Sequence, residues 1–246
     1  MKKNNVFILI GLFVIFLTFQ ACKKDDPSSL GFKMKAVDTG SQNLKSSGAI
    51  TLLPLNWDTA LIVVSELEFE AEYQESNSQG SSEVKVQFEW EGNMTLDLLA
   101  EPQVFATYEL PDGTYDEIEL KVKSKDLPGS GDPNFYLAGT ISIPDATVPI
   151  VLIVNEDFEI ETKVEDWVIN TQNGSFYSGL IEISLGQLFN NITIQELIGA
   201  TLVDGRIVIS SGINAGLYEK IMENIGSSGD CGQDDDDNGD DDDGDD

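Results

Sequence analysis

The chain has 246 residues, of which 44 are acidic, 14 are basic and none is histidine, so its formal net charge is −30 at pH 7. That charge argues against binding to nucleic acid, because contact with phosphates needs a cationic surface, and against a body that lies on anionic lipid. The lack of histidine excludes Ser-His and Cys-His nucleophile pairs and the usual Cys/His zinc ligand sets. With 41% hydrophobic residues, the chain can still build the core of one sizeable domain or two small ones.

The first 21 residues have the layout of an export signal. Lys2 and Lys3 precede an apolar run of 14 residues, Val6–Phe19. A membrane-spanning helix needs about 20 such residues, whereas the apolar core of a signal peptide needs roughly 7–15. Ala21 is the small residue expected before the cut. We therefore predict cleavage after Ala21 and lipid modification of Cys22; the alternative is an ordinary signal peptide with an incidental cysteine.

A short charged segment, Cys22-Lys23-Lys24-Asp25-Asp26, follows the predicted cut. It resembles the start of mature surface lipoproteins of the Bacteroidota, in which a Lys followed by two acidic residues looks like a signal for transfer to the outer face of the outer membrane. The resemblance implies palmitate-type acylation and a lipid anchor as the contact with the membrane. Two or more acyl chains are enough for stable anchoring. We expect residues 22–30 to be a linker, and the mature chain to have a charge near −32 because only Lys2 and Lys3 are lost with the signal.

Short strands with turn chemistry between them dominate residues 31–225. In Thr59–Gln74 the apolar residues from Leu67 to Tyr73 alternate with glutamates from Glu66 to Glu72, which is typical of an antiparallel strand with one face in water. Glu83–Trp90 repeats the alternation, so these two strands are predicted to form a hairpin. The other predicted strands are Gly31–Val37, Met94–Leu99, Val104–Leu110, Tyr115–Val122, Phe135–Ile143, Val148–Val154, Phe158–Ile169, Phe176–Leu185 and Arg206–Ile209.

Helical patterns appear only toward the C-terminus. A helical turn is predicted over Leu185–Asn191, and Thr193 with Glu196 predicts a capping box for a short helix that ends near Gly199. Asn214 is predicted to cap a final helix. That helix has one apolar face, made by Leu217, Ile221 and Ile225, and Gly226 ends it. Residues 226–246 contain little to bury, so we predict a disordered acidic tail.

The fold class that follows is mainly β: an antiparallel β-sandwich, similar to immunoglobulin and prealbumin modules, with a short C-terminal helix. The turn Leu110-Pro111-Asp112-Gly113-Thr114-Tyr115 supports it, because Pro and Gly build the turn and Tyr begins the next strand. Together with Val63–Phe69 and Thr95–Leu99, this turn resembles a surface-lipoprotein domain known as domain of unknown function 4382. The resemblance spans Leu61–Val122 and implies no catalytic residues.

The acidic tail contains a spacing like that of a calcium-binding loop. The oxygen ligands would come from Asp234, Asp236, Asn238, Asp240 and Asp245, with Asp in place of the usual bidentate Glu. The alternatives are an accidental match within an aspartate run, loose condensation of divalent cations, and simple electrostatic extension. Calcium is the only cofactor that the sequence suggests, and otherwise we expect none.

Three further residues are candidates for specific roles. Trp57 stands near Pro54 outside a clear strand, so it is the best candidate for stacking on a sugar ring, although most such aromatics are core residues. Thr59 lies in Asp58-Thr59-Ala60, which looks like an O-glycosylation site of exported Bacteroidota proteins; the alternative is a turn before a strand. If Cys22 carries lipid, Cys231 has no partner in the chain, and is a free thiol in the flexible tail or forms an intermolecular disulfide.

These patterns favour a non-enzymatic lipoprotein, exposed on the cell surface, that binds or presents a glycan or an envelope protein. One alternative is a calcium-responsive module that uses the acidic tail. A glycan-active enzyme built on a carboxylate pair is another, but with 44 acidic residues candidate pairs are too numerous to identify one.

Overall fold

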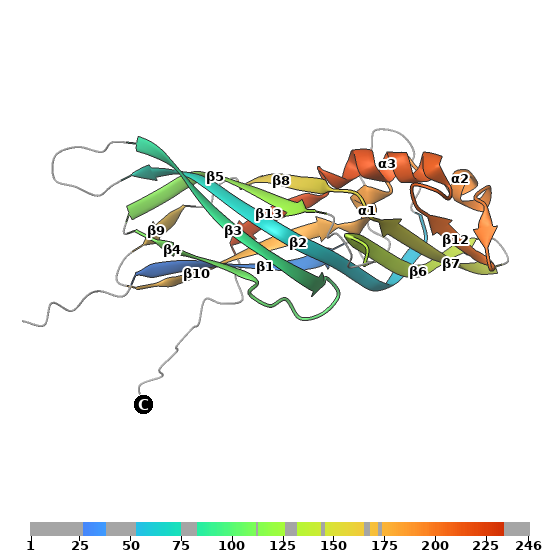
Figure 1. Cartoon of the computed structure of the whole chain (residues 1–246), viewed down its shortest axis with the longest axis horizontal. Helices are drawn as coiled ribbons and strands as arrows, with labels where there is room; N and C mark the ends of the chain where they lie inside the picture. The colour runs from blue at the N-terminus through green and yellow to red at the C-terminus, as the bar shows by residue number, and fades with distance from the viewer. Residues whose placement is uncertain are drawn as a thin grey trace, which may run out of the picture.

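The computed structural model describes residues 27–37, 53–74, 83–111, 113–125, 132–143, 146–164, 168–171 and 174–233. The predicted signal peptide, Cys22 and the tail residues Asp234, Asp236, Asn238, Asp240 and Asp245 lie outside these ranges. Within these ranges the body is elongated and built mainly from strands, with three short helices gathered at one end (Figure 1). No helix in the described ranges is long and apolar enough to cross a membrane.

The elements are bounded as follows. The strands are β1 (Ser28–Val37), β2 (Leu55–Gln74), β3 (Glu83–Asp97), β4 (Ala106–Leu110), β5 (Gly113–Ser124), β6 (Phe135–Ile143), β7 (Ala146–Val154), β8 (Phe158–Val164), β9 (Ile169–Thr171), β10 (Phe176–Ser184), β11 (Leu202–Val203), β12 (Arg206–Ile209) and β13 (Gly229–Gln233). The helices are α1 (Leu185–Leu188), α2 (Ile194–Ile198) and α3 (Ala215–Ile225).

The described part of the chain forms two sheets, and the long strand β2 connects the two halves of the larger one. The smaller sheet has the order β13-β10-β1-β4. The larger has the order β11-β12-β7-β6-β2-β5-β8, with β3 paired to β2 and β9 paired to β5. One edge of β2 pairs first with β6, over residues 55–62, and then with β5, over residues 66–74, while β3 pairs along its other edge. The 20 residues of β2 therefore belong to both halves of the body.

One half of the body is a sandwich between the smaller sheet and the β3-β2-β5-β8 part of the larger one. Its core is aromatic: the ring centroids of Phe32 and Phe69 are 6.0 Å apart, and those of Phe69 and Tyr108 are 6.1 Å apart. The hydroxyl of Tyr108 donates to the carbonyl of Leu67 at 2.5 Å. Leu67, Phe69 and Ala71 are buried on one face of β2, so the predicted alternation is confirmed.

In the other half, helices lie against the sheet β12-β7-β6-β2. Helix α3 buries Leu217, Tyr218, Ile221 and Ile225, which confirms the predicted apolar face. The side chain of Asn224 donates to the carbonyls of Leu188 and Asn190, and so connects α3 to the end of α1 and the segment that follows it. Helices α1 and α3 thus cover the end of the body that the small sheet does not reach (Figure 1).

Several predictions are confirmed. The chain is mainly β with two sheets, few helices and a short C-terminal helix. Strands β2 and β3 form an antiparallel hairpin. The capping box of α2 is complete, because the Thr193 hydroxyl accepts from the Glu196 amide at 3.3 Å and the Glu196 carboxylate accepts from the Thr193 amide at 2.9 Å.

Other predictions about the strands are wrong. The pairing is not wholly antiparallel, because β1 runs parallel to β10 and β12 runs parallel to β7. The predicted strands Glu83–Trp90 and Met94–Leu99 are one strand, β3, since a long partner, β2, holds both. The predicted strand Phe158–Ile169 is β8 and the beginning of β9, which pair with different stretches of β5.

The folded domain also extends beyond both of its predicted bounds, residues 31 and 225. The predicted linker 22–30 is wrong over its last three residues, because β1 begins at Ser28 and Leu30 is buried. The predicted tail 226–246 is wrong over its first eight residues. The carbonyls of Gly226 and Ser228 accept from the amides of Glu161 and Ser184, and β13 pairs antiparallel with β10. Edge pairing requires only backbone amides and carbonyls, so the polar sequence of β13 does not prevent it.

The start of α3 differs from the prediction as well. Asn214 occupies the residue before the helix, but its side chain makes no capping hydrogen bond. It accepts from the amide of Thr201 at 2.8 Å and donates to the carbonyls of Thr201 and Val208, at 3.0 and 2.7 Å. Asn214 therefore links the segment before β11, the strand β12 and the start of α3, and its backbone is left-handed, with φ of 54°.

Candidate functional site

Trp57 is a core residue, so its predicted role in stacking on a ligand is wrong. It is 7% exposed within β2, and its ring lies 5.3 Å from that of Phe189, centroid to centroid. Across the sheet it faces Gly139, where an added Cβ would come within 2.1 Å of the Asn56 carbonyl oxygen. The close fit of these two strands, with Phe189 on top, leaves no room for a sugar ring.

Thr59 lies within β2, opposite Ala138 of β6, and is half-buried. The register of β2 against β6 shifts between Trp57 and Thr59, with the exposed Asp58 at the irregularity. The alternative of a turn before a strand is therefore wrong. O-glycosylation of Thr59 stays a prediction.

Cys231 lies in a strand and not in a flexible tail. It sits in β13 opposite Ile181 of β10 and is 8% exposed. Burial, with Asp230 beside it, raises the pKa of the thiol well above its usual range, which suppresses the reactive thiolate. An intermolecular disulfide would require β13 to leave the sheet first.

Carboxylates gather on the face of β2 and β3 that points away from the sandwich core. Ligand oxygens of Glu66, Glu68 and Glu89 lie within 4.8 Å of one another, the only such group of three in the described part of the chain. The Nζ of Lys123 is 2.5 Å from Glu66 Oε1 and also bonds to Glu68, while Lys125 bonds to the second oxygen of Glu66. The cluster therefore already contains its own cations.

Glu66 is the centre of this cluster, and its exposure was predicted wrongly. The alternation places Glu66 on the water-facing side of β2, yet its side chain is only 4% exposed. The register of β2 against β3 shifts between Val64 and Glu66. The side chains of Lys123, in β5, and Lys125, just after it, cover the carboxylate. Hydrogen bonds from Lys123 and Lys125 lower the pKa of Glu66 from 4.5 to about 2. The carboxylate is thus held ionised and neutralised, which suits cross-strand stabilisation better than proton transfer.

The same pattern continues along the sheet. Lys121 lies 2.9 Å from Glu119 and 3.7 Å from Glu70, and Lys163 lies 3.7 Å from Glu119. Lys121 lowers the pKa of Glu119, and Glu119 in turn raises that of Lys121. We use the name carboxylate–lysine ladder for the set made of Glu66, Glu68, Glu70, Glu119, Lys121, Lys123, Lys125 and Lys163, which lie on β2, β5 and β8 or, for Lys125, just after β5. It connects three strands by opposite charges.

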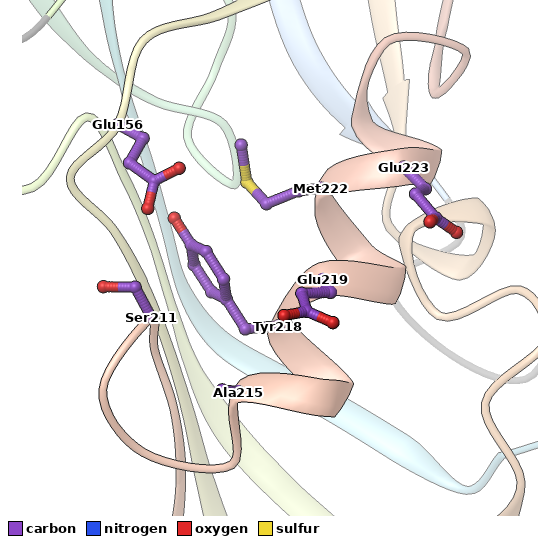
Figure 2. A pocket seen from close by; sticks show the side chains of 7 residues that line it. All are labelled: Glu156, Ser211, Ala215, Tyr218, Glu219, Met222 and Glu223. Carbon is purple, nitrogen blue, oxygen red and sulfur yellow. The ribbon is translucent and has the colours of Figure 1, made fainter.

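A second acidic region is a pocket of about 510 Å³ beside α3 (Figure 2). It lies between α3, the turn from β7 to β8 and the loop from β12 to α3. Its lining consists of Glu156, Ser211, Ala215, Tyr218, Glu219, Met222 and Glu223. In contrast to the carboxylate–lysine ladder, the lining contains three carboxylates and no lysine or arginine. We call it the α3 pocket.

Tyr218 is the most buried group of the α3 pocket, at 4% exposed, and its hydroxyl oxygen has no hydrogen bond of normal geometry. The hydroxyl points toward the carboxylate of Glu156 (Figure 2). Burial first, and then the charge of Glu156, raise the pKa of Tyr218 to about 12. The hydroxyl therefore stays protonated at neutral pH and can both donate and accept a hydrogen bond.

The backbone around the α3 pocket is fixed. Asn134, which is 1% exposed, donates its side-chain amide to the carbonyl of Glu156 at 3.0 Å and so holds the turn from β7 to β8. Ser210 and Ile213 form a backbone bridge, with hydrogen bonds of 2.9 and 3.2 Å, that shapes the loop before α3. The sequence does not predict this pocket. The one signal for it was the pair Glu219 and Glu223, one turn apart beside the apolar face of α3.

No family model matches the chain, and neither a curated protein nor a solved structure does so significantly. The resemblance of Leu61–Val122 to domain of unknown function 4382 therefore stays a prediction.

Proposed function

We propose that this chain is a lipid-anchored binding and presentation module of the bacterial outer surface, with no catalytic activity of its own. Its ligand belongs to a glycan or to another envelope component. The predicted lipid on Cys22 supplies the contact with the membrane, and the body supplies the binding surface.

The single observation that supports this function is the short distance between the anchor and the folded body. Ser28, the first residue of β1, is fully buried and lies six residues after Cys22. Six residues span at most about 20 Å. Ser28 pairs with Leu110, beside the turn into β5, at the end of the body where β9 lies. Helices α2 and α3 lie toward the opposite end (Figure 1). A lipid on Cys22 would therefore hold one end of the body at the membrane and present the helix-covered end outward.

The chemistry of the carboxylate–lysine ladder supports binding or scaffolding over catalysis. A general acid or base works best with a pKa near the working pH, but Lys123 and Lys125 lower the pKa of Glu66 to about 2. The negative charge of the mature chain would also keep the body away from anionic lipid, so that it stands on its tether.

The anchor is tested by labelling cells of a Bacteroidota host with an alkyne analogue of palmitate. The wild-type chain should take up the label, and the variant Cys22→Ser should not. Cys231→Ser is the matched control, and it should be labelled like the wild type. Label that persists in Cys22→Ser contradicts the anchor.

Exposure is tested by adding protease to intact cells. The body should be digested in whole cells, while a periplasmic marker stays intact. A protein that is cut only after the cells are lysed would contradict a surface location.

A glycan array and a pull-down with the full chain, each compared with a glycan hydrolysis assay, then separate binding from turnover. Release of sugar by the chain would contradict a non-enzymatic role.

A further inference from the structure

We infer that two copies of this chain pair edge to edge through the first half of β3, around a two-fold axis that passes through Gln87. The two β3 strands run antiparallel, and they join the larger sheets of the two copies into one continuous sheet. The inference goes beyond the proposed function, because it depends neither on acylation of Cys22 nor on the identity of a ligand.

One edge of β3 is open to a further strand. Among the described residues, β3 pairs with β2 alone, along one of its two edges. Its first half, Val84–Trp90, begins at the end of the body away from the helices (Figure 1), because Val84 is opposite Tyr73, and Tyr73 pairs with Tyr115 beside β9. An open edge presents backbone amides and carbonyls to any strand that can approach it. A second copy can therefore reach this edge while the helix-covered ends of both copies stay free.

The apolar side of this segment is only partly covered. Val84 is 51% exposed. The next residues on the same side of the strand are partly buried against the core, namely Val86, Phe88 and Trp90. With the axis at Gln87, Val84 of each copy lies opposite Trp90 of the other. Val86 lies opposite Phe88 in the same way. Aromatic and β-branched residues that face each other across two strands stabilise the pairing, so the two rows cover each other.

The charged side of the segment is complementary to itself. Lys85 and Glu89 are both exposed and lie two residues on either side of Gln87, so each faces the other across the axis. Neither forms an ion pair within the described ranges. Residues directly opposite each other in an antiparallel pair have their Cβ atoms about 5 Å apart, and opposite charges there are stabilising. The pair thus gains two equivalent contacts between Lys85 and Glu89.

Glu89 also has a local reason to attract a lysine. Its carboxylate lies within 4.8 Å of those of Glu66 and Glu68. Lys123 bonds to both of those carboxylates, but no described lysine or arginine forms an ion pair with Glu89. Glu89 is therefore the carboxylate of this group that lacks a cation, and Lys85 of a second copy supplies one at the right position.

The register also limits the contact. One step beyond Val84–Trp90, Glu91 would lie opposite Glu83 of the other copy, and like charges directly opposite are destabilising, so the paired segment ends there. Each copy has a net charge of −30, but at physiological salt this repulsion is screened beyond about 8 Å, and the facing residues are closer than that. Because the contact is small, we expect a weak and reversible pair that a covalent cross-link can trap.

The test places a cysteine on the axis. The full chain is expressed in the host used for the acylation test, with Cys231→Ser to remove the buried thiol and with Gln87→Cys. Two cysteines about 5 Å apart at their Cβ atoms can be joined by oxidation or by a short, membrane-permeable bismaleimide. Non-reducing gel electrophoresis should then show a species of twice the chain mass, above the background of Cys231→Ser alone.

The matched control is Thr95→Cys in the same background. Thr95 is exposed on the same strand, but the proposed register places the two copies of this residue roughly 50 Å apart. Thr95→Cys should therefore give no more cross-linked product than the background.

An exchange of charges tests the register. Lys85→Glu and Glu89→Lys each place like charges opposite each other, and each should reduce the cross-linked fraction of Gln87→Cys about fivefold. The two changes together restore opposite charges and should return the fraction to within about twofold of its original value. Arg206→Glu makes the same change of charge as Lys85→Glu at an exposed position in β12 and should have no effect. Thermal unfolding shows whether each variant is folded.

The inference is overturned by any of four results. The first is no species of twice the chain mass above background. The second is equal cross-linking of Thr95→Cys and Gln87→Cys, which would indicate random encounters. The third is a double exchange that stays as low as the single variants. The fourth is a Gln87→Cys product that contains a different protein, which would then be the occupant of this edge.

Discussion

The carboxylate–lysine ladder and the α3 pocket are both acidic, but they differ in what neutralises the charge. On the ladder, three glutamates of β2 each meet a lysine of the neighbouring strand β5, and Glu66 also meets Lys125 just after that strand. In the α3 pocket, Glu156, Glu219 and Glu223 line a cavity that holds no lysine or arginine. In a chain of net charge −30, the density of acidic residues therefore does not identify a site. The two regions differ instead in the local supply of cations.

The largest expected difference between the two regions is in stability. Glu66→Ala removes a buried carboxylate and leaves Lys123 and Lys125 with fewer partners. We expect the free energy of unfolding to fall by about 2 kcal/mol, less than for a fully buried pair because both lysines can turn toward water. Chemical denaturation measures it. Glu219→Ala in the α3 pocket is the matched control and should change stability by less than about 0.5 kcal/mol; equal losses would remove the distinction.

A second prediction concerns acid. Because Lys123 and Lys125 lower the folded-state pKa of Glu66 from 4.5 to about 2, the ionised carboxylate stabilises the fold. This contribution is fully present above about pH 4.5 and is lost as the pH falls toward 2. Stability of the wild type should therefore decline over this window, and Glu66→Gln should show a flatter decline. Glu219→Gln should keep the wild-type slope, and a steeper slope in Glu66→Gln would contradict the assignment.

Two of the buried tyrosines, Tyr108 and Tyr218, give a third test, with effects of different sign. The Tyr108 hydroxyl donates to Leu67, so Tyr108→Phe should lower the free energy of unfolding by about 1 kcal/mol. The Tyr218 hydroxyl has no such bond, so Tyr218→Phe should leave stability unchanged or raise it by up to about 1 kcal/mol. Both variants are measured by thermal and urea unfolding. A clear loss in Tyr218→Phe would mean that its hydroxyl already has a stabilising partner in the free chain.

The smallest effect is expected for an exposed pair outside both regions. Glu196 bonds Lys220 at 2.6 Å and accepts from the Thr193 amide in the capping box, and these contacts lower its pKa to about 2. Water screens both groups. Glu196→Gln keeps the capping geometry and should lower the melting temperature by about 1 °C or less. If the melting temperature of Glu196→Gln fell as far as that of Glu66→Ala, exposure would not distinguish the two classes of ion pair.

The features that could be predicted from the sequence depend on residues close together in the chain. Alternation with a period of two identified Leu67 and Phe69 as core residues and the β2–β3 hairpin as antiparallel, because each depends on neighbours along one strand. The Thr193–Glu196 capping box was predicted for the same reason, since its partners are three residues apart.

The features that could not be predicted depend on segments far apart in the chain. Trp57 is buried because Phe189, from the helical region, packs on it. Cys231 is buried because β13 adds to the free edge of β10, and its Gly-Asp-Cys-Gly sequence has no strand pattern. The α3 pocket requires the turn at Glu156 to meet Tyr218, and neither residue has a local pattern that points to the other.

The parallel pairing of β1 with β10 has a mechanical consequence for a tethered protein. Nine residues of β1, from Ser29 to Val37, are in register with β10, and β4 pairs along its other edge. A pull on the chain through Cys22 would act along the axis of β1 and load these hydrogen bonds together, in shear, so that they would have to break at once. An edge hairpin pulled from its tip would instead open one bond at a time. The strand nearest the predicted anchor is therefore the one placed to withstand drag on the body.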